Sequence, residues 1–305
     1  MLFSKLAFVA FTVAAGVEAA TKKSSTKTSK TTKAKTTSAK TTLATSTGAA
    51  ATSAPAAAAT TAAGTAAAAA GSGSSGGLKS ALPAPAGTSM LKAAQTVAAG
   101  ASFDGKGFLF DRSDNTCSGQ SEGGAADGAF VVMSGGTLSN VIIGPNNGEG
   151  IHCMGPCTLN NVWWKDVCED ALTLKQTSGT TTINGGGAFN AEDKVLQHNG
   201  GGSLVVKDFY AENVGKLYRS CGNCKTQYAR KSSFDNIKVS GAKAIAGING
   251  NLGDVSTISN SCILDGAIIC DMFKGTDNNS EEPTQTAKVP DGKACATSAV
   301  KVSGC

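Results

Sequence analysis

Short apolar segments recur along the chain at a nearly constant interval, and this repeat limits the possible folds more than any other feature. Each segment is rich in β-branched residues and is bounded by Gly, Asn or Asp. The segments begin at Thr137, Thr158, Thr182, Ser203, Ser233 and Thr257. Their spacings are 21, 24, 21, 30 and 24 residues. A period in the twenties indicates a solenoid, in which each repeat forms one turn of a coil.

The composition of the repeats predicts strands. The segments show no helical periodicity, and they lack the leucine pattern of a leucine-rich repeat. We therefore predict an all-β fold, a right-handed parallel β-helix, preceded by a disordered low-complexity tail. An irregular β-sandwich is the alternative that the period alone leaves open.

Charged residues recur at one position of this repeat. They fall 11 to 13 residues after four successive segment starts, at Glu149, then Glu169 and Asp170, then Asp193 and Lys194, then Lys216. Equivalent positions of successive coils stack about 4.8 Å apart, so these side chains should form one column on one face. Stacked carboxylates repel one another unless a cation lies among them. The column predicts a cation site beside basic groups, with a solvated charged stripe as the alternative.

The N-terminus has the pattern of a secretory signal peptide over residues 1–19. Lys5 gives the positive start, an apolar core too short to span a bilayer follows, and Val17-Glu18-Ala19 resembles a cleavage site. Later segments are not apolar for long enough to form a membrane helix. We expect a secreted, extracellular protein without a membrane partner.

Residues 20–90 have low complexity, first rich in Thr, Ser and Lys and then in Ala, Gly and Ser. Such a composition buries too little apolar surface to offset its ordering entropy, and it is typical of an O-glycosylated stalk. Residues 20–82 carry a charge of +8, whereas residues 83–305 carry −3. The tail therefore either holds to acidic wall polymers or serves as a spacer, and residues 91–305 form the folded domain.

All ten cysteines lie in that domain, and an even number in a secreted chain predicts up to five disulfides whose pairing cannot be read from sequence. Cys221-Gly-Asn-Cys224 is expected to be structural, because no second CxxC or paired His accompanies it. His152 and His198 are expected to be packed and hydrogen-bonded. Trp163 and Trp164 are adjacent in a strand, so one faces inward; the other either stacks on a sugar or packs.

Long motifs in this domain resemble a known family. The runs at 140–176, 186–202 and 215–230, with FDGKG at 103–107 and GQSEG at 119–123, closely resemble the secreted pectate lyases of polysaccharide lyase family 3. The resemblance covers roughly residues 93–305. It implies a calcium-dependent enzyme that cleaves the 1,4-linked α-galacturonan of plant cell walls by β-elimination, giving 4,5-unsaturated oligogalacturonates.

The resemblance also implies roles for individual residues. The residues that carry out the reaction would be Lys194, Lys216 and Arg219. The Ca²⁺ ligands would be Glu149, Glu169, Asp170 and Asp193. Lys194 would be the base, with a pKa lowered by neighbouring cations, while Lys216 and Arg219 would hold the substrate carboxylate. Glu122, in GQSEG, is a further candidate, both for a carboxylate of the preceding coil beside the Ca²⁺ ligands and for contacting the substrate.

Two points stay open at this stage. Either Lys194 or Arg219 could take the proton, although arginine is rarely deprotonated, which favours Lys194. Two other function classes also compete: a β-helical hydrolase, and a wall-binding β-helix without activity. The expected partner is polygalacturonate or pectin, with no nucleic acid, and the expected state is a monomer.

Overall fold

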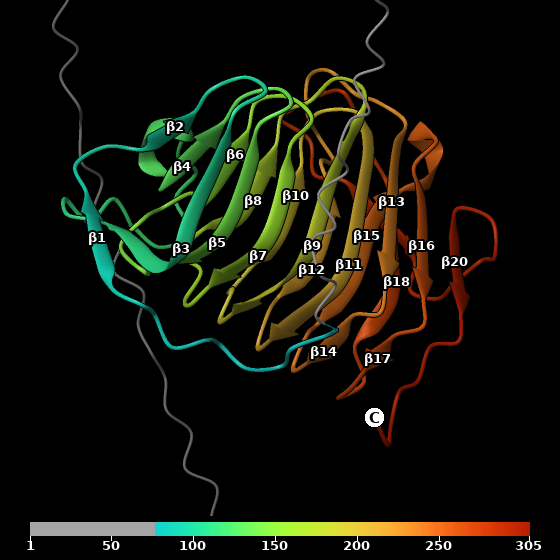
Figure 1. Ribbon diagram of the computed structural model, residues 1–305. Helices are drawn as coiled ribbons and strands as arrows, with labels where there is room; N and C mark the ends of the chain where they lie inside the picture. The colour runs from blue at the N-terminus through green and yellow to red at the C-terminus, as the bar shows by residue number, and fades with distance from the viewer. Residues whose placement is uncertain (1–76) are drawn as a thin grey trace, which may run out of the picture. The chain divides into compact units, whose positions relative to one another are not determined.

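The computed structural model describes residues 77–305, so the predicted signal peptide and residues 20–76 of the predicted tail lie outside the described residues. Two sheets form most of this part (Figure 1). The first sheet contains, in spatial order, β1 (Thr88–Leu91), β3 (Ser102–Arg112), β5 (Thr137–Ile143), β7 (Thr158–Trp164), β9 (Thr180–Phe189), β11 (Gly202–Glu212), β13 (Arg230–Asp235), β16 (Val255–Ser259) and β20 (Cys295–Ser298), with β14 (Lys238–Ser240) and β17 (Cys262–Ile263) beside them.

The second sheet contains β19 (Thr284–Ala287), β18 (Ile268–Lys274), β15 (Ala244–Asn249), β12 (Lys216–Ser220), β10 (Lys194–His198), β8 (Asp170–Leu174), β6 (Ile151–Cys153), β4 (Phe130–Val132) and β2 (Gln95–Val97). Two short 3-10 helices, η1 (Ala125–Asp127) and η2 (Gly250–Leu252), lie in connections. Strand β1 crosses the predicted domain boundary at residue 90.

The chain alternates between the two sheets, and neighbouring strands within each sheet come from successive coils. Pairing between them is parallel, for example β7 with β9 and β10 with β12, and only the last pair of the second sheet, β18 with β19, is antiparallel among the pairs described. This arrangement confirms the predicted parallel β-helix. It rules out the β-sandwich, whose sheets are antiparallel.

The predicted register is confirmed at most coils and wrong at one. Thr137 pairs with Thr158, and Thr158 pairs with Thr182. Ser233 likewise pairs with Thr257. Thr182, however, pairs with Val205 instead of Ser203, and Val205 pairs with Ser233. The coils before and after Val205 are therefore 23 and 28 residues long. Strands β9 and β11 both begin before this position, and the first Ser or Thr of an apolar run therefore does not mark the same place in every coil.

Residues in the left-handed conformation bend the first sheet around the core. Asn140, Asn161 and Asp208 have φ values of 53°, 52° and 55° within their strands. Asn and Asp tolerate this conformation better than other residues with side chains. The Asn161 amide also donates to Asn140 Oδ1 in the preceding coil at 2.9 Å. These bends let one strand per coil cover two sides of the interior.

Apolar side chains stack in columns between the sheets. One column runs through six successive coils, and each member is at most 1% exposed: Leu138, Leu159, Ile183, Val206, Phe234 and Ile258. Because each coil stacks on its neighbours, the interior is continuous along the solenoid and supports the residues on its outer faces.

The two tryptophans face opposite ways, as predicted. Trp164 packs in the main core, whereas Trp163 lies on the outer side with Ile142 and Tyr210, against Leu82 and Phe189. Both indoles are 1% exposed, so the outward one is covered by protein and has a packing role.

All ten cysteines form disulfides, which confirms the predicted cross-linking. The pairs are Cys117–Cys168, Cys153–Cys157, Cys221–Cys224, Cys262–Cys305 and Cys270–Cys295. The CxxC sequence is thus a closed local bridge in a turn. Over residues 77–305, helices long and apolar enough to cross a membrane are not found.

Candidate active site

The predicted charged column lies on the second sheet. Asp170, Lys194 and Lys216 occupy paired positions on the adjacent strands β8, β10 and β12. Glu149 stands two residues before Ile151, just as Asp170 stands two residues before its partner Leu172. The structure therefore brings the four coils into line, with acids at one end and basic residues at the other.

A second row of polar residues runs beside this column, three residues further along each strand. In order it contains His152, Thr173, Gln197, Arg219, Gly247 and Asp271. Arg219 therefore has a side chain on one flank, at Gln197, and a glycine on the other. This asymmetry decides the direction in which the arginine extends.

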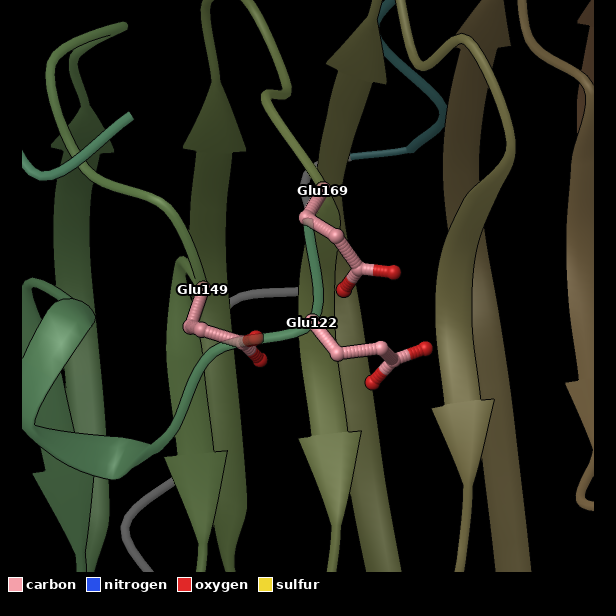
Figure 2. Close-up of side chains that lie close together, drawn as sticks. All are labelled: Glu122, Glu149 and Glu169. Carbon is pink, nitrogen blue, oxygen red and sulfur yellow. The ribbon is translucent and has the colours of Figure 1, made fainter. Parts of the chain in front are cut away.

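Three glutamates from three separate segments lie close together at the acidic end (Figure 2). One carboxylate oxygen from each of Glu122, Glu149 and Glu169 lies within 4.8 Å of the others. Glu149 and Glu169 are 3% and 2% exposed, whereas Glu122 is exposed. The sequence left Glu122 a candidate both for the carboxylate set and for substrate binding, and its carboxylate lies beside those of the two buried glutamates.

The connection that carries Glu122 is tied down at several points. Cys117 is bonded to Cys168, the residue before Glu169, and the Gln120 side chain donates to the Cys168 carbonyl at 2.6 Å. The Gly123 amide donates to Glu149 Oε1 at 2.7 Å. Because the pairing of Cys117 with Cys168 cannot be read from sequence, nothing in the spacing alone could have placed Glu122 here.

Two buried carboxylate oxygens at this end lack a hydrogen-bond partner among the described residues: Glu169 Oε2 and Asp170 Oδ1. Burial raises the pKa of both groups, and nearby carboxylates add to that effect although Lys194 opposes it. Unpartnered oxygens cost free energy that a bound cation would recover. Carboxylates are the ligands that Ca²⁺ prefers, so the residues present fit a calcium ion.

Lys194 lies at the centre of the charged column. Its Nζ atom is 2.7 Å from Asp193 Oδ2, 3.1 Å from Glu169 Oε1 and 3.4 Å from Asp170 Oδ1. Burial alone would lower the pKa of Lys194, but the three carboxylates outweigh it and raise the pKa above its ordinary value. The lowered pKa expected from the sequence is therefore wrong for this arrangement, because acids surround the amine.

Asp193 joins the lysines instead of the glutamate cluster. One of its oxygens contacts Lys194, and the other lies 2.5 Å from the Nζ atom of Lys216. Burial would raise the pKa of Asp193, but hydrogen bonds from the two lysines lower it overall. Both oxygens are engaged, which distinguishes this carboxylate from those of Glu169 and Asp170.

Arg219 closes the basic end of the site. Its Nη1 atom donates to Asn249 Oδ1 at 3.1 Å, and its guanidinium lies over the Phe273 ring, 4.0 Å from the centroid. Burial lowers the pKa of Arg219 to about 10, although the Asp271 carboxylate opposes the change. The side chain is held in place and only 7% exposed.

The two histidines are packed and hydrogen-bonded, as predicted. His152 Nε2 lies 2.9 Å from Glu149 Oε2, so it supports a member of the acidic cluster. His198 contacts the Tyr218 hydroxyl at 3.0 Å and the Gly201 carbonyl at 3.1 Å, and burial lowers its pKa to about 4.

The fold and the site together define a class: a parallel β-helix with a cluster of carboxylates beside fixed basic groups on one outer face. A pectate lyase family model matches residues 79–280. The chain is 48% identical over 216 residues to the probable pectate lyase D of Emericella nidulans, covering 70% of this chain and 81% of that protein. It is 50% identical over 192 residues to pectate lyase H of the same fungus, covering 63% and 74%.

Solved structures agree with these relatives. The catalytic domain of the pectate lyase PelI from Erwinia chrysanthemi is 30% identical, with a TM-score of 0.56, over 70% of this chain and 98% of that domain. PelI in complex with tetragalacturonic acid is 32% identical, with a TM-score of 0.57, over 72% and 71% of the two chains. The protein belongs to the pectate lyase family, of the family 3 type. It is an enzyme, a lyase acting on polysaccharide, and this excludes the hydrolase and the inactive binder.

Proposed function

We propose that this pectate lyase cleaves polygalacturonate by calcium-dependent β-elimination and releases 4,5-unsaturated oligogalacturonates. One observation supports this most directly. Buried carboxylate oxygens that accept no hydrogen bond from the described residues lie on the same sheet face, and within two strands, of a row of fixed basic groups. A reaction that must bind a polyanion and remove a weakly acidic proton needs both kinds of group together.

The substrate sets the chemical problem. The C5 proton of a 4-linked uronate is α to a carboxylate that is already negative, so it is very weakly acidic. Bound at this site, calcium would neutralise that charge and stabilise the enediolate-like transition state. Glu149, Glu169 and Asp170 would hold the ion, and Glu122, whose carboxylate lies beside those of the two glutamates, would join them. Asp193, also predicted as a ligand, would contribute through its contacts with the lysines.

Lys194 is the proposed base. Its three carboxylate neighbours favour its charged form, so it accepts a proton only when their charge is offset. The base is thereby linked to occupancy of the acidic cluster. Arg219 is the competing candidate, since burial lowers the pKa of its guanidinium to about 10. Lys216 and Arg219 would hold the uronate carboxylate, the arginine through two parallel N–H donors.

The setting of the enzyme is part of the proposal. We expect secretion through residues 1–19 and action on plant cell walls as a monomer. The low-complexity residues 20–76 would link or anchor the enzyme without taking part in the reaction, because their composition cannot form a packed site. The rest of the predicted linker packs on the folded domain, through Leu82 and β1.

Absorbance of the unsaturated uronide tests the proposal on polygalacturonate, with and without a calcium chelator. We expect absorbance to rise with calcium and to stop rising when the chelator is added. Asp170→Asn should abolish the rise while thermal unfolding stays near wild type. Asp235→Asn, at an acid of β13 on the other sheet, is the matched control and should keep full activity. Reducing ends without absorbance, or full activity in excess chelator, would contradict the proposal.

A further inference from the structure

The arginine at the basic end of the site rests on groups that take no part in the charged column. Arg219 belongs to the row of paired positions that continues through Gly247 on β15 to Asp271 on β18. Two residues further along the same strands, Asn249 and Phe273 are also paired with each other. The guanidinium contacts both of these side chains. It therefore reaches across β15 to the second strand beyond its own.

Gly247 makes this reach possible. A Cβ atom at that position would lie 2.7 Å from Arg219 Cδ, closer than side chains approach one another. The glycine has no positive φ, so its backbone does not require a glycine. The methylene groups of Arg219 fill the space that the glycine leaves. This explains why a glycine interrupts the row of polar side chains at this position.

Asn249 is itself held in one orientation. Its amide nitrogen donates to Ser220 Oγ at 2.8 Å and to the Cys221 carbonyl at 3.0 Å, and its backbone amide donates to Asp254 at 2.8 Å. These bonds fix the amide so that Oδ1 faces Arg219. Only one edge of the guanidinium is used by this contact.

Phe273 contacts the guanidinium through its flat face. A ring beneath the guanidinium plane attracts the cation without using any of its N–H donors, which lie in the plane. Asp271, the nearby acid, accepts a hydrogen bond from Gln285, and within residues 77–305 it makes no ion pair with Arg219. The outer donors of the arginine thus stay available to another carboxylate.

We propose that Phe273 and Asn249, in the space opened by Gly247, are positioning residues that hold Arg219 extended, with its free edge turned to a substrate carboxylate. The inference rests on the proposed function, in which Arg219 binds a uronate. Neither positioning residue need touch the substrate: the ring fixes the plane of the guanidinium, and the amide fixes its rotation. Their effect should therefore be lost when the guanidinium is absent.

The test compares binding and turnover for substitutions at Phe273. We expect Phe273→Leu to weaken binding of tetragalacturonate, measured by calorimetry with calcium present, by about three- to tenfold. The Michaelis constant should rise by a similar factor with a smaller change in kcat. Phe273→Tyr should restore binding to within about twofold. Phe103→Leu, at a partly buried phenylalanine of β3, controls for lost packing and should leave binding unchanged.

A double-mutant cycle separates positioning from general stability. In an Arg219→Lys background, Phe273→Leu should add almost nothing, because the group that it positions is gone. If Phe273→Leu unfolds more easily than the Phe103→Leu control, Gly247→Ala gives the answer: it should raise the Michaelis constant without removing any contact group. Equal losses from Phe273→Leu in both backgrounds, or wild-type binding by Gly247→Ala, would overturn the inference.

The same measurements distinguish this inference from the proposed function. Wild-type protein that neither binds tetragalacturonate nor forms unsaturated product would refute the proposed function and the positioning roles together. Active wild-type enzyme with a Phe273→Leu variant that binds equally well would refute the positioning roles alone.

Discussion

The two ends of the charged column differ in how completely their side chains are paired. At the acidic end, Glu169 and Asp170 are buried with one oxygen each lacking a hydrogen bond within the described chain. At the basic end, Arg219 has a hydrogen-bond acceptor, an aromatic ring and a glycine that makes room for it. The acidic end leaves buried acceptor oxygens without hydrogen bonds from the described residues, whereas the side chain at the basic end is held by its protein neighbours.

This difference suggests separate roles: the acidic end would bind a cation, and the basic end would orient the substrate. A buried carboxylate with a raised pKa destabilises the folded chain when no cation is bound. The carboxylates of the acidic end should therefore lower the free energy of unfolding of the cation-free protein and raise its affinity for a cation. A guanidinium that is held in advance loses little conformational entropy when a substrate binds. Substitutions at the two ends should therefore have opposite effects on the stability of the cation-free protein.

The largest effect is expected at Lys194, which lies between the acidic end and the basic end. Lys194→Arg keeps the positive charge but raises the intrinsic pKa beyond use, so kcat should fall by about three orders of magnitude. Binding of tetragalacturonate should change little. Steady-state absorbance assays and calorimetry would measure both, with Lys207→Arg on β11 as the control. Near wild-type turnover would move the base to Arg219 or Lys216 and leave the lyase proposal intact.

Glu169→Gln should give the next largest effect, at the acidic end. Without the buried charge, terbium affinity, followed by luminescence as a probe for calcium, should fall about 10- to 100-fold. In chelator, the variant should unfold at the same temperature as wild type or higher, because burial and the neighbouring carboxylates disfavour the charged form of Glu169 even with Lys194 beside it.

Arg219→Gln is the counterpart at the basic end. It should lower the unfolding temperature in chelator, since Asn249 and Phe273 lose their partner. A lower unfolding temperature for Glu169→Gln as well would remove the contrast between the two ends.

A smaller effect should follow from releasing the Glu122 segment. Replacing Cys117 and Cys168 together with serine should weaken terbium binding several-fold, because Glu122 and Gly123 are no longer held beside Glu149. The matched control replaces Cys262 and Cys305, a bridge of similar span remote from the acidic cluster. Equal affinities in the two double variants would show that the tether does not shape the cation site.

The smallest effect concerns the core beneath the basic end. Burial lowers the pKa of His198 to about 4, so the folded state resists protonation that the unfolded state accepts. Stability from this group is present above the unfolded pKa of about 6.5 and is lost as pH falls toward 4. Between pH 7 and pH 5, wild type should lose about 2 kcal/mol more than His198→Gln in urea unfolding. Equal losses of unfolding free energy in wild type and His198→Gln would contradict the assignment of this pH dependence to His198.

Most of the fold could be predicted because a solenoid repeats its packing, and a repeat is visible in one sequence. The strand register at Ser203 could not be predicted, because the ends of strands β9 and β11 depend on the turns between coils. The column of Asp170, Lys194 and Lys216 followed from the period alone.

The details of the site were less accessible. Glu122 reaches the cluster through a disulfide whose partners are 51 residues apart, and no local pattern encodes that pairing. The direction of the Lys194 pKa shift depends on which charges lie nearest, and both acidic and basic residues occur near Lys194 in the repeat. The residues that hold Arg219 come from β15 and β18, three and seven elements further along the chain, where apolar and small residues carry no sign of a role in the site.

The antiparallel strand β19 has a consequence for how molecules meet one another. A stack of parallel strands ends in unpaired amides and carbonyls, and these invite a strand from a second molecule to continue the stack. Here β19, four residues long and mostly exposed, runs against the direction of β18 at one edge, while the opposite edge of that sheet is β2, three residues long. Edges this short offer few backbone donors and acceptors to a second molecule, so this sheet should resist end-to-end aggregation even in a crowded medium.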